Sequence, residues 1–253
     1  MNGDMENEIK QIIIDQMEAL NRPDFYRSPL IAFSSAHDER YSKLKEIIGQ
    51  WHLNPVELLP DAKSVVSYFV PFTKSVVLEP AREKDVSIIW AEAYLIINSY
   101  FDHINKSLSD YLVKLGFSVK SIPATNTYIP EEMKSMWSHR SAAVIAGLGS
   151  FGANKMLITE KGSGGRFCSI ITSAPLKPTQ HSTSNGCLNM LDGSCGLCID
   201  VCPVDALKPD SIDKFACQDE IFKNEEILEE KTAYKGAGVC GKCISVCPLA
   251  YVE

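Results

Sequence analysis

The sequence predicts an α+β protein with a large cysteine-poor body and a small cysteine-rich module at the C-terminal end. The chain has 253 residues, of which 45% are hydrophobic and 23% charged, as in a globular protein with a buried core. Helical and strand-like patterns follow one another along the body. Eight of the nine cysteines lie in the last 67 residues. We therefore expect two domains, the body at residues 1–178 and the module at residues 179–253.

The first half of the body predicts two shorter helices, a buried strand and a long helix. Apolar residues recur every three to four positions in residues 4–20 and 39–50, which favours helices. Residues 62–72 form a β-branched and aromatic run bounded by prolines, which indicates a buried strand. Residues 87–115 carry a long apolar stripe and end before Gly116, a typical residue after a helix. Pro23, Pro29 and Ser34-Ser35 indicate a loop.

The second half of the body predicts shorter elements. Residues 117–122 favour a strand, and residues 138–146 favour a helix that ends at Gly147 or Gly149. Residues 155–159 and 166–172 are expected to pair as a hairpin around the glycine-rich turn at 162–165. The polar segment 177–185 is the expected linker to the module.

Charge and segment patterns exclude several classes of protein. The 25 basic and 32 acidic residues give a net charge of −7, so no overall basic field attracts nucleic acid or an anionic membrane. No apolar run reaches the roughly 18 residues of a membrane span. The N-terminus shows neither a signal peptide nor a twin-arginine pair. We therefore expect a cytoplasmic protein without membrane contact, whose cysteines stay reduced or bind metal.

The module contains one cysteine motif twice. Residues 195–203 read CGLCIDVCP and residues 240–248 read CGKCISVCP. Both match C-x2-C-x3-C-P, the later part of the bacterial ferredoxin motif, in which three cysteines bind one [4Fe–4S] cluster and the fourth binds the other. Closely spaced thiolates on a tight turn supply several corners of a cubane. The proline after the last cysteine turns the chain away and removes one amide hydrogen.

A full ferredoxin motif would have a cysteine at position 192, where this chain has Asp192. Cys187 is the nearest spare thiol, and Asp192 is then expected to cap a loop, although it stays an alternative ligand. With Cys187, the eight cysteines divide into two sets of four by the exchange rule. One cluster is assigned Cys187, Cys195, Cys198 and Cys247; the other is assigned Cys202, Cys217, Cys240 and Cys243.

Other interpretations of the cysteines and glycines are weaker. Zinc also binds CxxC pairs, and disulfides would suit an exported chain, but neither explains the repeated x3-C-P ending. Cys168, on a predicted strand, is expected to be a buried apolar residue. Residues 147–152 match G-x-G-x-x-G, yet a helix-like segment precedes them and no carboxylate follows at the distance that a dinucleotide-binding fingerprint requires.

The body and module together resemble the epoxyqueuosine reductase and reductive dehalogenase group. The resemblance is carried by LPDAKSV at 59–65, by HRSAAVIAGLGSFGANKMLIT at 139–159, by TSAPL at 172–176 and by the double cysteine motif. It spans roughly residues 55–250. It implies a nitroreductase-like α/β core with a C-terminal two-[4Fe–4S] ferredoxin-like module.

The resemblance also implies a function and a cofactor. The group reduces organic substrates with cobalamin, to which the ferredoxin module passes electrons. Cofactor-binding residues are then expected among Gly147, Leu148, Gly149, Asn154, Lys155 and His139. His139 could instead be buried in the first turn of a helix capped by Ser138, and Lys155 could be a solvated surface lysine. The implied electron donor is a low-potential ferredoxin or flavodoxin.

This chain departs from the group in ways that leave alternatives open. The group's catalytic aspartate has no match in residues 123–140, where Glu131 or Glu132 could stand in or could be exposed loop residues, so the catalytic residue is unknown. The chain ends six residues after Cys247, without the C-terminal repeat that these reductases use on tRNA, so a tRNA substrate is doubtful. An electron carrier or reductive activator for a corrinoid partner protein is therefore an alternative function, and flavin is an alternative cofactor.

Overall fold

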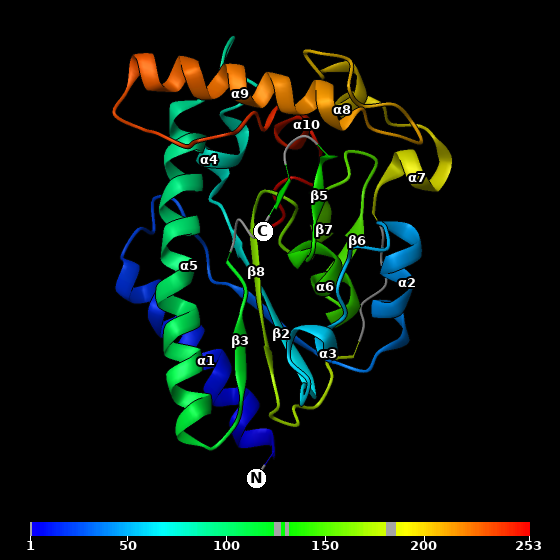
Figure 1. Ribbon diagram of the computed structural model, residues 1–253. Helices are drawn as coiled ribbons and strands as arrows, with labels where there is room; N and C mark the ends of the chain where they lie inside the picture. The colour runs from blue at the N-terminus through cyan, green and yellow to red at the C-terminus, as the bar shows by residue number, and fades with distance from the viewer. Residues whose placement is uncertain (1, 124–127, 130–131, 181–185) are drawn as a thin grey trace.

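The computed structural model describes residues 2–123, 128–129, 132–180 and 186–253 (Figure 1). At its centre lies a four-stranded antiparallel sheet. The strands stand in the order β1 (Leu30–Ser35), β2 (Ser64–Pro71), β8 (Gly165–Thr172) and β3 (Val119–Ser121). The sheet follows from the β-branched and aromatic runs that the sequence shows at β2 and β8.

Strand β2 is the buried centre of the body. Every one of its residues is buried, because helices cover both faces of the sheet. Val66 and Tyr68 pack in the core cluster that contains the α5 side chains, whereas Val65 and Phe69 belong to clusters on the other face. This alternation is the two-residue period of a strand. The predicted strand at 62–72 is confirmed.

Helices α1 (Asn2–Leu20) and α5 (Ile88–Lys114) pack together on one face of the sheet, and α6 (His139–Ala146) packs on the other (Figure 1). The Ser87 side chain caps α5 by accepting a hydrogen bond from the Trp90 amide at 3.2 Å. Gly116 follows α5 with φ +85°, as its predicted role requires. The remaining body helices are α2 (Glu39–Ile47), α3 (Pro55–Leu58) and α4 (Lys74–Leu78).

Two small ladders complete the body. β4 (Tyr128–Ile129) pairs with β5 (Lys134–Ser135), and β6 (Gly149–Phe151) pairs with β7 (Leu157–Thr159). The predicted hairpin of 155–159 with 166–172 is therefore wrong. Strand β7 turns back onto β6, while β8 inserts between β2 and β3, where its apolar residues are buried on both faces.

The module lies across one end of the sheet (Figure 1). Its helices are α7 (Leu188–Asp192), α8 (Leu197–Asp200), α9 (Lys214–Lys231) and α10 (Lys242–Ser245). Leu228 and Val239 of the module belong to the same core cluster as the α5 side chains. The last residues return to the body, where the Gly164 amide donates to the Ala250 carbonyl at 2.9 Å. The domain boundary at 178/179 stays a prediction.

Two sequence predictions for connecting segments need correction or completion. The loop expected around Pro29 and Ser34 contains β1, which pairs with β2 along its whole length. Of the expected linker, residues 177–180 are described, and the Thr179 amide donates to the Phe33 carbonyl at 2.9 Å, which holds this segment against β1. Residues 181–185 lie outside the described residues.

Candidate iron–sulfur centres

The first set of thiols surrounds a cavity of about 210 Å3 next to α7 and α8. Its thiols stand just before α7, just before and within α8, and after α10. The Ala153 amide of the body donates to the Cys187 sulfur at 3.4 Å. The four cysteines that line the cavity are Cys187, Cys195, Cys198 and Cys247.

The second set lines a larger cavity, of about 620 Å3, between the module and the body. One of its thiols stands on α9 and one on α10, and the Ala206 amide donates to the Cys202 sulfur at 3.2 Å. An amide that donates to a ligand sulfur disperses its negative charge. The four cysteines that line this cavity are Cys202, Cys217, Cys240 and Cys243.

The two motifs fold alike and lie against each other. Each forms a four-residue helix, α8 or α10, with its last cysteine just beyond the helix and followed by proline. Helices α8 and α10 are in contact. As a result, Cys202 lies with the thiols of the second motif, and Cys247 lies with those of the first. The structure thus brings together the two sets of four that the exchange rule predicts.

The thiols of each set repel one another when ionised. Burial raises the pKa of Cys198, and the neighbouring Cys247, Cys187 and Cys195 raise it further. Burial and the other thiols of its set raise the pKa of Cys243 to about 12. Cationic iron among four such sulfurs offsets both costs and keeps the thiols ionised. The chemistry of the donor set therefore fits an iron–sulfur centre in each cavity.

Within the described residues, no group of three or more His, Cys, Asp or Glu side chains is arranged to hold a metal ion. A cubane is bound differently, because its four iron corners are spread apart and each takes one thiolate. Each of the two cavities has four cysteines on its walls, the number of thiolates that a cubane takes.

Asp192 does not line the first cavity. It is exposed at the end of α7, and its carboxylate accepts a hydrogen bond from the Ser194 amide at 2.9 Å. Its contacts with Ser194 lower the pKa of this carboxyl. Asp192 thus caps the loop before Cys195, as expected.

Asn154 joins the body to the module. Its side-chain amide donates to the Cys243 carbonyl at 3.2 Å, and its side-chain oxygen accepts from the Met156 amide at 3.1 Å. Asn154 is buried and lines both thiol cavities. Lys155 is half-buried, has φ +60° and lines the larger cavity. Both residues lie beside the module instead of in a separate cofactor pocket of the body.

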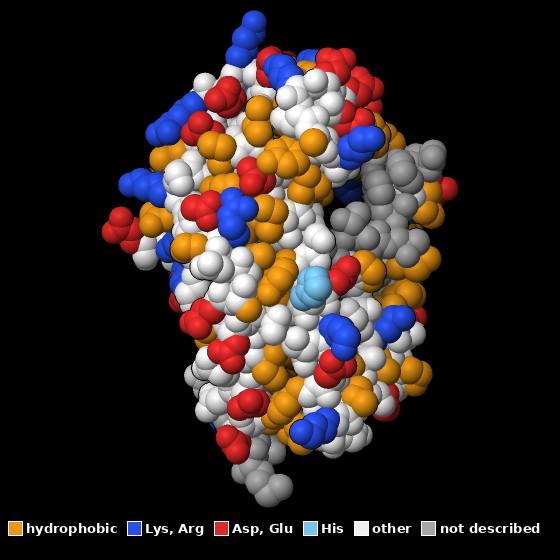
Figure 2. All heavy atoms as spheres, turned by 90° about the vertical axis from the view of Figure 1, so that its left-hand side faces the viewer, with side chains coloured by type: hydrophobic (Ala, Val, Ile, Leu, Met, Phe, Trp, Pro, Cys, Tyr) orange, Lys and Arg blue, Asp and Glu red, His pale blue; other side chains and the backbone are white. Residues whose placement is uncertain are grey.

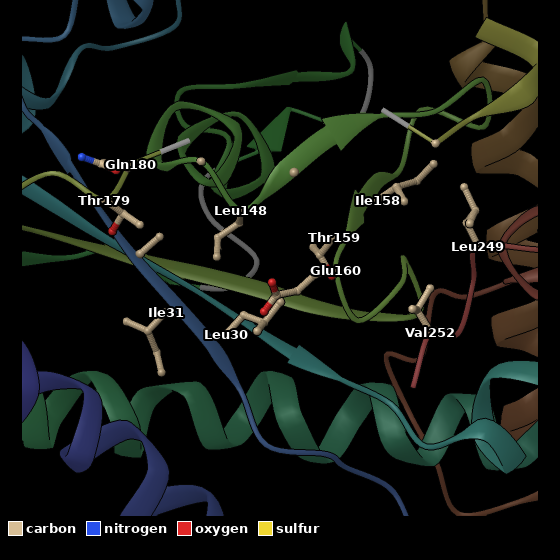
Figure 3. Close-up of a pocket in the computed structure, with 14 residues that line it drawn as sticks. Leu30, Ile31, Leu148, Ile158, Thr159, Glu160, Thr179, Gln180, Leu249 and Val252 are labelled. Atoms are coloured by element: carbon tan, nitrogen blue, oxygen red, sulfur yellow. The ribbon is translucent and has the colours of Figure 1, made fainter. Parts of the chain in front are cut away.

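Gly147, Leu148 and Gly149 line a different cavity, of about 370 Å3, in which Leu148 and Leu30 approach from opposite sides (Figure 3). Gly147 ends α6 with φ +91°. A Cβ on Gly149 would lie 2.0 Å from the Ile158 carbonyl oxygen, so glycine allows β6 to approach β7. Helix capping and strand packing thus account for both glycines. This cavity shares Ile158 and Leu249 with the first thiol cavity.

His139 is buried in a hydrogen-bonded network. Its Nε2 lies 3.0 Å from the Pro123 carbonyl, which can only accept, so Nε2 carries the proton. Its Nδ1 then accepts from the Ser169 hydroxyl at 2.7 Å, and that hydroxyl oxygen accepts from the Trp137 indole at 3.0 Å. Burial lowers the pKa of His139 to about 4. His139 lines none of the three cavities, which agrees with the expectation of a buried first-turn histidine.

Three further predictions concern residues away from the thiols. Cys168 is fully buried on β8, where the Asn105 amide donates to its sulfur at 3.4 Å, as expected for a structural cysteine. Glu132 is exposed and forms an ion pair with Lys134. Glu131 lies outside the described residues. Among the described residues, no helix is both long and apolar enough to span a membrane.

Sequence reasoning missed the body wall of the larger cavity. Tyr94 on α5 and Arg140 on α6 both line it. Arg140 directly follows His139 in the segment 139–159. A charged residue at the start of that predicted helix was the sequence feature that could have indicated it. Tyr94 could not be found from the sequence, because it is one of several aromatic residues within a long helix.

The comparisons with known proteins cover both parts of the chain. Residues 193–250 match the family of 4Fe-4S double cluster binding domains. An epoxyqueuosine reductase from Leadbetterella byssophila is 28% identical over 171 residues, which make up 65% of this chain and 50% of that protein. The resemblance to epoxyqueuosine reductases is confirmed. The C-terminal module is a double [4Fe–4S] cluster-binding domain, and Cys187 stands six residues before the matched range.

Solved structures show the fold. An epoxyqueuosine reductase from Streptococcus thermophilus is similar with a TM-score of 0.59 and 18% identity, over 99% of this chain and 66% of that one. The Bacillus subtilis epoxyqueuosine reductase is similar with a TM-score of 0.55 and 21% identity, over 96% of this chain and 66% of that one. A catabolic reductive dehalogenase in complex with 3-bromo-4-hydroxybenzoic acid is similar with a TM-score of 0.61 and 15% identity, over 87% of this chain and 30% of that one. In sequence, this chain matches only half the length of the Leadbetterella byssophila epoxyqueuosine reductase.

Proposed function

We propose that this protein is an iron–sulfur oxidoreductase that delivers electrons to an organic acceptor held between its module and its body. One observation carries the proposal: two sets of four cysteines line two neighbouring cavities, and the larger cavity opens onto residues of the body. Clusters of this kind supply one-electron transfer at low potential. The epoxyqueuosine reductase relative supports an enzyme over a purely structural protein.

In this proposal, each thiol set holds one [4Fe–4S] cluster, with Cys187 instead of Asp192 as the fourth ligand of the first. Cys187 lines the cavity and its sulfur accepts a hydrogen bond from the Ala153 amide, whereas Asp192 is exposed to solvent. The apolar side chains between the two cavities exclude water, among them Ala153, Leu207 and Ile199. Asn154 fixes the position of the module against the body, because its side chain, which belongs to the body, donates a hydrogen bond to the Cys243 carbonyl.

We further propose cobalamin as the cofactor of the larger cavity. Its walls are mostly apolar and carry a few polar groups, the usual character of a cofactor site. Asn154 and Lys155 would contact the cofactor from the body, as would Tyr94. Cobalamin, when bound, supplies a strongly nucleophilic low-valent cobalt. We do not propose tRNA as a substrate, because a chain with a net charge of −7 has no overall basic field to attract it.

The alternative is an electron carrier or reductive activator that serves a corrinoid partner protein. It is favoured by exposed apolar side chains on α7, next to the first thiol cavity: Leu188 is 49% exposed and Leu191 is 64% exposed. Such side chains suit a protein contact. On either interpretation, we propose that a ferredoxin or flavodoxin donates the electrons.

The cluster ligands can be tested by iron analysis of protein purified without oxygen. We expect about eight irons and eight sulfides per chain. Cys187→Ala should lose about half of the iron, because one set keeps only three thiolates, and Asp192→Ala should keep all of it. Zinc in place of iron would contradict the proposal, and iron loss in the Asp192 variant alone would reverse the ligand assignment.

The acceptor can be tested with hydroxocobalamin added to the iron-loaded protein while its absorption spectrum is followed. Binding with a shift to the base-off spectrum supports the enzyme. Intact clusters without corrinoid binding would instead support the electron carrier.

A further inference from the structure

The larger thiol cavity contains more space than its thiols need. It measures about 620 Å3 and the other about 210 Å3, although each is lined by four cysteines. The additional space lies toward the body, where Tyr94, Met133 and Met156 form part of the wall. A small organic molecule therefore has room beside the second cluster.

Arg140 faces this space from the start of α6. Its Nη1 donates to the Lys155 carbonyl at 3.0 Å and contacts the Met156 sulfur at 3.2 Å. Within the described residues, its Nε and Nη2 have no hydrogen-bond partner and no carboxylate pairs with it. The side chain is exposed and borders the cavity. Desolvation lowers the pKa of this guanidinium.

A second guanidinium does not line the cavity itself but lies behind Tyr94, which forms part of its wall. Arg166 on β8 donates from Nε to the Asn98 side chain at 3.0 Å and stacks on the Tyr94 ring, 4.6 Å from its centroid. Arg166 also forms no ion pair within the described part of the chain. Lys155 lines the cavity beside Arg140. A guanidinium that pairs with no carboxylate and lines a cavity can bind an anion through charge-assisted hydrogen bonds.

The α9 side of the cavity carries two acidic side chains and one basic one, Lys214. Glu220 and Glu225 of α9 line the cavity, and Glu220 pairs with Lys223 at 3.5 Å. A molecule with one anionic group would therefore place that group at Arg140 and keep its apolar part away from α9. Figure 2 shows a hollow on the side of the molecule seen there, with a basic side chain inside it.

We propose that Arg140 anchors an oxyanion, a carboxylate or a phosphate, of an organic molecule bound in the larger cavity beside the second thiol set. Guanidinium recognises both groups by charge-assisted hydrogen bonds. Two sources share this chemistry: a small-molecule carboxylate substrate, and the phosphate of a bound corrinoid. The inference rests on the proposed function, because it names the ligand chemistry of the same site.

The test uses anaerobic protein with its iron content measured first, benzoate as the carboxylate probe and benzamide as its uncharged match. By calorimetry, we expect benzoate to bind at least about tenfold more tightly than benzamide. Arg140→Gln should weaken benzoate binding by about 10- to 100-fold, as for loss of a charge-assisted hydrogen bond. Arg140→Lys should keep most of the affinity, since the positive charge remains.

Controls separate this site from other effects. Arg82→Gln removes an equally charged side chain that is 64% exposed and pairs with Glu79, and it should leave benzoate binding unchanged. The same variants are titrated with hydroxocobalamin. Weakening of benzoate assigns the anchor to a substrate, and weakening of hydroxocobalamin alone assigns it to the corrinoid phosphate; either supports the proposal.

Three results would overturn the inference. One is that neither ligand binds to protein with a full iron content, which leaves the electron-transfer function standing. Another is equal affinity of wild type and Arg140→Gln for both ligands. The third is an Arg140→Gln variant that changes only the potential of the second cluster, since Arg140 would then merely balance cluster charge. A lack of iron would instead contradict the proposed function.

Discussion

At the scale of single residues, burial decides the chemistry of the titratable side chains. His139 and Asp192 were both candidates for a functional role on sequence alone. The structure places His139 among Trp137, Ser169 and the Pro123 carbonyl, and places Asp192 in solvent as the cap of a loop. The cap formed by Asp192 was expected, since its partner Ser194 is two residues away, whereas the partners of His139 could not be named because they lie 16 to 30 residues away in the chain.

His139 is expected to stay neutral at all pH values at which the protein is active. Burial lowers its pKa from 6.5 to about 4, so the unfolded chain binds a proton at higher pH than the folded one. The stability that neutral His139 contributes is thus present above pH 6.5 and lost as pH falls toward 4, by roughly 3 kcal/mol in all.

Nitrogen NMR of labelled histidines checks this prediction. The His139 ring should keep a protonated Nε2 and an unprotonated Nδ1 down to about pH 5, with His139→Gln used to identify its signals. Protonation between pH 6 and 7 would contradict the buried network.

At the scale of elements, the sequence pattern predicted the helices and strands whose apolar residues pack into the core of the body. Helices α1, α5 and α6 and strand β2 were predicted with nearly their observed bounds. Helix α9 was missed because it lacks such a stripe: its buried residues include Gln218 and Asn224 beside Leu228. Asn224 is buried there with a partner, the Val239 carbonyl, which lies on a later segment of the module, and a sequence pattern does not show such partners.

Asn224 is expected to hold α9 in place and with it Cys217. Its side-chain amide donates to the Val239 carbonyl at 3.1 Å, next to Cys240. Asn224→Ala would leave that buried carbonyl unpaired, at a cost of about 1 to 3 kcal/mol. Iron should therefore leave the second cluster several-fold faster when a chelator is added.

The matched control for this prediction is Glu226→Ala, an exposed position on the same helix. Iron release in this variant should equal that of the wild type. Equal release rates for Asn224→Ala and Glu226→Ala would show that α9 is held by other contacts.

At the scale of the whole molecule, body and module share one core. Ala250 packs in the cluster built around α5, and Arg27 of the body donates to the Val252 carbonyl at 2.5 Å and to the Lys161 carbonyl at 3.1 Å. The Arg27 guanidinium also stacks on Tyr251, 4.4 Å from the ring centroid. These contacts tie the C-terminal segment to the first third of the chain.

Because of this shared core, body and module are expected to unfold in one step. Heating the iron-loaded protein should cause the visible cluster absorption and the far-ultraviolet circular dichroism to change at the same temperature. Arg27→Ala should lower both midpoints together. Cluster loss well below the melting of the helices would show that the module unfolds by itself.

The sequence by itself determined the double cysteine motif, the division into two sets of thiols and most of the body's helices. These features depend on spacing along the chain, which a turn or a helix converts directly into position. The tertiary structure alone decided which space each candidate residue faces. Gly147, Asn154 and His139 stand within 16 residues, yet they lie at one cavity, between two others, and in a closed network. Those surroundings come from strands and helices distant in sequence, so packing determines them and local pattern does not.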